Sequence, residues 1–85
     1  MKIVFAGTAN FGIPVLEKIA PLHDLPLIIT QPDQPTGRKK VPTPPPIKLW
    51  AEKNNITVEQ SDKIANLKSQ IANLNPDLLL VAAYG

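Results

Sequence analysis

The 85-residue chain contains no cysteine and a single histidine, His23. The lack of cysteine excludes a disulfide framework and a thiolate metal site, and one histidine argues against a zinc centre. Acidic residues are missing from one stretch, since no Asp or Glu stands between Asp33 and Glu52. Long hydrophobic runs are also missing, because the first apolar run ends at Gly7, too short for a signal peptide or a membrane span. We therefore expect a soluble, cytoplasmic protein without a membrane partner.

The stretch without acidic residues is rich in proline and basic residues. Residues 30–48 hold six of the ten prolines, together with Arg38, Lys39 and Lys40 in succession. Proline locks φ and removes a hydrogen-bond donor, so the sequence predicts a long loop over residues 31–46. The net charge of +2 is small, so any binding of nucleic acid would have to use this loop. Its cations suit a polyanion such as a phosphate backbone, and the alternative is a solvated charge run on a linker.

Apolar runs alternate along the chain with segments of helical periodicity. We predict strands over residues 2–6, 25–30, 56–59 and 78–83, and helices over residues 10–20, 45–54 and 61–74. Asn10 and Ser61 are the predicted N-caps of the first and third helices. This βαβαβαβ pattern predicts an α/β fold with an open, parallel, Rossmann-like sheet. The expected strand order is 3-2-1-4, with the first two helices on one face and the third on the other.

In this order the direction of winding reverses between the first and fourth strands. Ligands of open α/β sheets bind at such a point, outside the carboxyl ends of the strands. Gly7, Thr8 and Tyr84 are therefore the residues predicted to line a crevice there. Phe11, beside the first turn, is either a core residue or an apolar wall for a ligand.

The first turn does not match the common nucleotide-binding motifs. A G-x-G-x-x-G motif requires glycine where Ala9 stands, and a Walker A motif requires Lys-Ser or Lys-Thr where Ile13-Pro14 follow Gly12. The sequence offers no combination of nucleophile, base and orienting residue that would form a catalytic set. Asp33 has the residue type of a turn. We therefore predict a crevice without catalytic residues of its own and without a metal.

Five segments together resemble the N-terminus of the methionyl-tRNA formyltransferase family. They are FAGT at Phe5–Thr8, TQPD at Thr30–Asp33, GRKK at Gly37–Lys40, PPPIKLWAEKNNI at residues 44–56, and NPDLLLVAAYG at residues 75–85. The resemblance implies transfer of a formyl group from 10-formyltetrahydrofolate to the amino group of methionyl initiator tRNA, in translation initiation. It also implies a monomeric full-length enzyme whose catalytic asparagine, histidine and aspartate lie beyond Gly85.

By the same resemblance, residues 1–85 are the N-terminal part of the catalytic domain, with the sheet truncated after its fourth strand and a β-barrel domain absent. Such a piece alone is expected to be inactive. Arg38 falls on an important arginine of the family and, with Lys39 and Lys40, is expected to contact the tRNA acceptor arm. Phe11 matches the aromatic residue of the methionyl side-chain pocket. Ala9 departs from the family, which usually has proline there.

Two other functions remain open from the sequence. One is another folate-dependent formyl-transfer enzyme, acting on a nucleotide sugar or a small amine. The other is a protein-interaction module without enzymatic activity, because Pro42 to Pro46 contain a P-x-x-P pattern that polyproline-binding grooves recognise.

Overall fold

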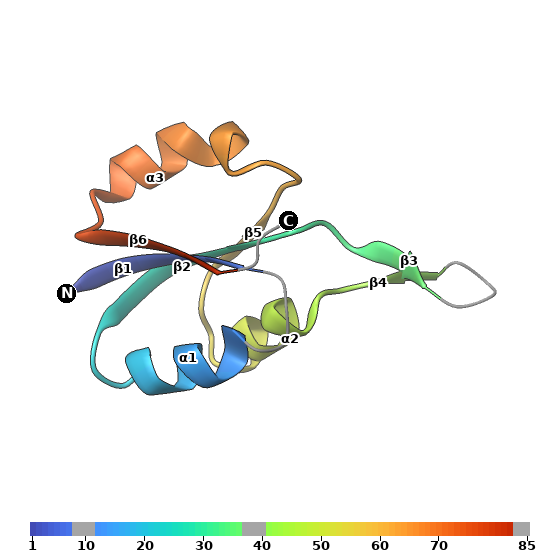
Figure 1. The fold of residues 1–85 in the computed structure, drawn as a ribbon, viewed down its shortest axis with the longest axis horizontal. Helices are drawn as coiled ribbons and strands as arrows, with labels where there is room; N and C mark the ends of the chain where they lie inside the picture. Colours follow the sequence, from blue (N-terminus) through green and yellow to red (C-terminus); the bar gives the residue numbers. More distant parts are fainter. Residues whose placement is uncertain (8–11, 37–40, 83–85) are drawn as a thin grey trace.

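The computed structural model describes residues 1–7, 12–36 and 41–82, which form a layered α/β body and a two-stranded ribbon. In the body, a parallel sheet lies between helices on its two faces (Figure 1). The ribbon projects from one end of the body along the longest axis (Figure 1). The α/β class that the alternating pattern predicts is confirmed.

Four parallel strands form the main sheet. They are β1 (Lys2–Gly7), β2 (Asp24–Thr30), β5 (Val58–Gln60) and β6 (Leu78–Ala82). Their order is β5-β2-β1-β6, which is the predicted order 3-2-1-4 when these strands are counted along the chain. The winding direction therefore reverses between β1 and β6, as expected.

The helices cover the sheet on both sides. Helices α1 (Gly12–Ile19) and α2 (Pro46–Lys53) lie on one face, and α3 (Lys68–Leu74) lies on the other (Figure 1). This division is the predicted one. Pro46 is the first residue of α2, a position where the missing N–H leaves no helical hydrogen bond unmade.

Two apolar cores form on the two faces of the sheet. The core on the α1–α2 side contains the buried residues Ile3, Phe5, Leu16, Leu25, Ile28, Ile47 and Ala51. The core on the α3 side contains the buried residues Val4, Ala6, Leu27, Ile29 and Leu67. Successive residues of β1 alternate between the two cores, as side chains along a strand do. The apolar run of β1 therefore serves both layers, and β1 lies inside the sheet.

The segment after β5 differs from the prediction of one helix starting at Ser61. A short 3₁₀ helix, η1 (Ile64–Leu67), comes first, and α3 begins only at Lys68. Ser61 is not a helix N-cap: its Oγ accepts a hydrogen bond from the Lys63 N–H at 3.2 Å and donates one to the Lys63 carbonyl at 2.9 Å. A serine that bonds to the backbone two residues away stabilises a turn in place of a helix.

The proline-rich basic segment contains two strands that were not predicted. β3 (Gln34–Thr36) and β4 (Val41–Thr43) pair in antiparallel fashion and form the ribbon. Pro35 faces Pro42 in this pairing. Every second facing pair of an antiparallel ladder exchanges no hydrogen bonds, so two facing prolines fit there without loss of a bond. In the part of the chain that the structure describes, the ribbon pairs with no strand of the main sheet.

β6 is an outer strand with exposed apolar side chains. Within the described residues it pairs only with β1. Leu78, Leu79 and Val81 keep 44%, 39% and 51% of their surface exposed. A hollow of about 330 Å³ lies beside this strand, lined by Ile64, Ala65, Lys68, Ile71, Ala72 and Leu79. The α3 layer therefore covers β6 less completely than it covers β1.

Candidate functional site

Most of the residues predicted to form the site lie outside the described part of the chain. This is true of the crevice residues Thr8 and Tyr84, of Phe11, and of the three cations in residues 38–40. Gly7 is described, and it is the last residue of β1, one residue beyond the predicted strand. In sequence, Arg38, Lys39 and Lys40 stand between β3 and β4.

Gly7 lies where the carboxyl ends of β1 and β6 meet. It pairs with Ala82, and a Cβ on Gly7 would lie 2.7 Å from the Ala82 carbonyl oxygen and 2.8 Å from the Phe5 ring. A Cβ on Gly12 would lie 3.1 Å from the same ring and 3.2 Å from the Ile47 side chain. Gly7 thus allows the backbones of β1 and β6 to approach where a side chain would not fit, whereas a side chain at Gly12 would require the Phe5 ring or Ile47 to shift slightly.

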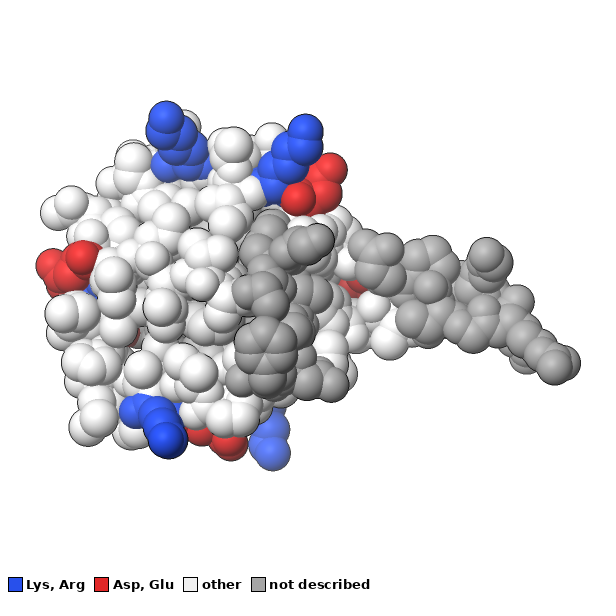
Figure 2. Space-filling view, in the orientation of Figure 1, with Lys and Arg blue, Asp and Glu red and all other residues white. Residues whose placement is uncertain are grey.

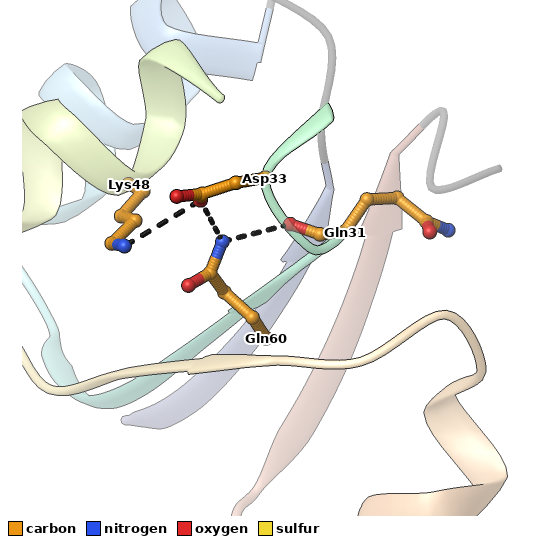
Figure 3. Close-up of polar contacts among 4 residues, drawn as sticks. All are labelled: Gln31, Asp33, Lys48 and Gln60. Carbon is orange, nitrogen blue, oxygen red and sulfur yellow. Dashed lines mark hydrogen bonds and ion pairs between the residues drawn. The ribbon is translucent and has the colours of Figure 1, made fainter. Parts of the chain in front are cut away.

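A cluster of polar side chains lies at the base of the ribbon (Figure 3). Asp33, one residue before β3, accepts a hydrogen bond at its Oδ1 from Gln60 Nε2, at 2.6 Å. The same oxygen lies 3.5 Å from Lys48 Nζ. Gln60 Nε2 also donates to the backbone carbonyl of Gln31, at 3.2 Å. Residues from β5, from α2 and from the segment that enters the ribbon are therefore joined at one carboxylate.

The sequence alone does not reveal this cluster, because Asp33 has the residue type of a turn and its partners are distant in the chain. Its partners are 27 and 15 positions away in sequence, as Gln60 and Lys48. The useful signal is indirect: Gln60 ends the strand that lies next to β2, and Gln31 follows the end of β2. Parallel neighbours end at the same edge of the sheet, so the strand order brings Gln60 to the start of the ribbon segment.

The charged residues of the body are dispersed. Figure 2 shows the described lysines and acidic residues around the periphery of one face, whose centre is uncharged. Three of the nine Lys and Arg residues are the consecutive Arg38, Lys39 and Lys40. The densest positive charge of the sequence therefore belongs to the segment between β3 and β4 and not to the body.

A second hollow lies at the opposite, amino-terminal end of the strands. It measures about 610 Å³ and is lined by Glu17, Ala20, Pro21, His23, Asp24, Leu25, Trp50, Asn54 and Ile56. Trp50 packs against the core of the α1–α2 side and also lines this hollow. Asp24 is the first residue of β2, so His23 is remote from the carboxyl ends of the strands, as predicted.

The described residues do not contain a cluster of side chains suited to holding a metal ion. Within residues 1–7, 12–36 and 41–82, no three His, Cys, Asp or Glu side chains are placed to hold a metal ion. Asp77, the other carboxylate at a strand junction, accepts a hydrogen bond from the Lys2 backbone N–H at 2.8 Å and so joins the starts of β1 and β6. In the same residues, no helix is long and apolar enough to cross a membrane.

The sequence of the chain is similar to those of known enzymes along its whole length. No family model matches the chain. A methionyl-tRNA formyltransferase of Hydrogenobaculum sp. (strain Y04AAS1) is 46% identical over 85 residues, 100% of this chain. One from Halalkalibacterium halodurans is 47% identical over 89 residues, and one from Listeria innocua is 44% identical over 86 residues. In all three cases the match spans 28% of the relative's length.

The parallel sheet, its strand order and its two helical layers define a Rossmann-like α/β fold. Within that class, the chain corresponds over its whole length to the N-terminal 28% of methionyl-tRNA formyltransferases, at 43–47% identity. The resemblance predicted from the five sequence segments is thus confirmed.

Proposed function

We propose that this chain is the N-terminal part of the catalytic domain of a cytoplasmic methionyl-tRNA formyltransferase that acts in translation initiation. The observation that carries the proposal is the identity of 43–47% over the whole chain to enzymes of that name. The strand order supports it, because the winding reversal at β1 and β6 is where open α/β sheets bind small ligands.

In the proposed reaction, the amino nitrogen of methionyl initiator tRNA attacks the formyl carbon of 10-formyltetrahydrofolate. A carbon–nitrogen bond forms, the bond to the folate nitrogen breaks, and one proton passes from the amine to that nitrogen. The tetrahedral intermediate carries an oxyanion, which needs hydrogen-bond donors and an acid–base group. We assign these groups, as the resemblance implies, to the part of the relatives that this chain does not cover.

The chain itself is assigned binding roles. The carboxyl ends of β1 and β6, with Gly7, Thr8 and Tyr84, border the pocket for the folate donor and for the methionyl end of the tRNA. Phe11 lines the part of this pocket that holds the methionyl side chain. The ribbon contacts the tRNA acceptor arm through Arg38, Lys39 and Lys40. Arginine and lysine in succession suit a phosphate backbone, and arginine also stacks on unpaired bases.

The structure supplies little support for a polyproline ligand. Pro42 is part of β4 and is paired with Pro35 in the ribbon. Pro45 is buried at the start of α2. A proline ligand must present an extended, solvated segment to an aromatic groove, and these two residues are used within the fold instead.

A hybrid enzyme tests the proposal. This chain replaces the matching N-terminal segment of the Listeria innocua relative, and formylation of methionyl initiator tRNA is measured together with thermal unfolding. We expect the folded hybrid to formylate the tRNA and the 85-residue chain alone to show no turnover. A hybrid that unfolds cooperatively but is inactive would contradict the proposed function. Turnover by the 85-residue chain would contradict the assignment of the catalytic groups to the remaining part of the enzyme.

A further inference from the structure

Side-chain contacts join the base of the ribbon to the body. Asp33 leads into β3, and Lys48 lies in the first turn of α2, five residues after β4. Their ion pair, at 3.5 Å, therefore connects the segment entering the ribbon with the helix that follows it. The 2.6 Å hydrogen bond from Gln60 joins both to the end of β5 (Figure 3).

We infer that Asp33, Gln60 and Lys48 are positioning residues that hold the ribbon in the direction required for tRNA binding. The inference rests on the proposed function, because it assigns the direction of the ribbon to the delivery of Arg38, Lys39 and Lys40 to tRNA. None of the three positioning residues needs to touch the tRNA itself.

The physical reason is the weakness of an isolated ribbon. A two-stranded hairpin is at best marginally stable in water, and within the described residues β3 and β4 pair only with each other. Contacts at its base must therefore fix its direction. Gln60 Nε2 bonds Asp33 Oδ1 and the Gln31 carbonyl together, which holds the chain that leaves β2 against the end of β5. A ribbon fixed before binding avoids an ordering cost when tRNA binds.

The charge of Asp33 makes the inference testable. A carboxylate close to a segment that binds a polyanion weakens that binding if electrostatics alone operates. Replacing Asp33 by alanine also frees Lys48 as an additional cation. Electrostatics alone therefore predicts tighter tRNA binding for Asp33→Ala, whereas a positioning role predicts weaker binding. The two explanations predict changes of opposite sign.

Asp62 provides a control of matched charge. It lies just after β5, is exposed, and its carboxylate accepts a hydrogen bond from Asn66 at 3.3 Å. In the hybrid enzyme we expect Asp33→Ala to raise KM for tRNA by roughly three- to tenfold, the size expected when an ordering cost moves to the binding step. We expect kcat and KM for the formyl donor to stay within about twofold. Asp62→Ala should leave KM for tRNA unchanged or lower it slightly.

Gln60→Ala separates geometry from charge, because it removes both hydrogen bonds without changing net charge. It should raise KM for tRNA as Asp33→Ala does. The double variant should have a KM for tRNA no higher than that of either single variant, as expected for residues that act as one unit. Asp33→Asn keeps an acceptor for Gln60 but not the ion pair with Lys48. We expect KM for tRNA of Asp33→Asn to lie between the values of the wild type and Asp33→Ala.

Three results would overturn the inference. Asp33→Ala could lower KM for tRNA as Asp62→Ala does, which would mean that only charge matters. KM for the formyl donor could rise equally with a large loss in Tm, which would mean general destabilisation. The effects of Asp33→Ala and Gln60→Ala on KM for tRNA could also be additive, which would mean that the two residues do not act as one unit. An Arg38→Leu variant tests the proposed function separately. If this variant binds tRNA normally, the ribbon does not bind tRNA and the proposed function fails in this respect. If Arg38→Leu weakens tRNA binding but Asp33→Ala and Gln60→Ala do not, only the positioning role is refuted.

Discussion

The parallel sheet and the β3–β4 ribbon are held in place by different interactions. β1 and β2 bury apolar side chains in cores on both faces. The ribbon pairs with itself, and the contacts identified at its base are polar and partly exposed. Burying one large apolar side chain contributes about 1.5–3 kcal/mol, whereas an exposed ion pair contributes about 0–1 kcal/mol. Stability therefore depends on the sheet, and the base contacts determine mainly where the ribbon points.

The largest effect on unfolding is expected in the sheet. Phe5 is fully buried under Gly7 and Gly12, so Phe5→Ala should lower the free energy of unfolding by about 3–5 kcal/mol. Val15→Ala is the control, because Val15 on α1 is 39% exposed and its change should stay within about 0.5 kcal/mol. Urea denaturation of the hybrid enzyme measures both losses, and equal effects of the two substitutions would contradict the account of the core.

A substitution on β6 should change the free energy of unfolding less than Phe5→Ala does, but it should clearly change the association of the chain with other copies. The sequence of this strand, LLLVA, carries no charge that would oppose pairing with another edge. We expect the 85-residue chain to associate in solution and Val81→Lys to reduce association. Leu49→Lys is the control, since Leu49 is 52% exposed on α2, away from the strand edge. Sedimentation velocity measures association, and a monomeric wild type with a sharp, reversible thermal transition would refute this expectation.

The parts of the fold that could be predicted are those that depend on apolar patterning. The runs KIVFA and LPLIIT predict buried parallel strands, and β1 and β2 lie where they predict. Pro46 fits only the first turn of a helix, and α2 begins there. The order of the strands follows from right-handed crossovers and the division of helices between two faces. These features come from local sequence together with general rules of packing.

The parts that could not be predicted depend on individual polar contacts. Ser61 has the residue type of an N-cap, but its hydroxyl bonds to Lys63 and the chain forms a turn and a 3₁₀ helix. The strands of the ribbon were missed because proline argues against strands unless the facing pair needs no N–H donor. The partners of Asp33 were missed because Gln60 is near it only after the sheet has formed.

The comparison between sheet and ribbon is tested most directly at Arg38. Arg38→Leu removes a charge but none of the apolar side chains of the two cores, so we expect the free energy of unfolding to change by less than about 0.5 kcal/mol. The kcat/KM for formylation should nevertheless fall, because a guanidinium can hold a phosphate with two hydrogen bonds or stack on an unpaired base. Lys39→Ala is the matched variant, since an ammonium is a hydrated point charge.

The decisive measurement is kcat/KM for formylation of initiator tRNA by the hybrid enzyme at two salt concentrations. We expect Arg38→Leu to cost on the order of 1–3 kcal/mol in kcat/KM. Lys39→Ala should cause a smaller loss that depends mainly on salt, as one phosphate contact does. Equal and small effects of the two substitutions would contradict the account, because the segment between β3 and β4 would then be only a solvated linker.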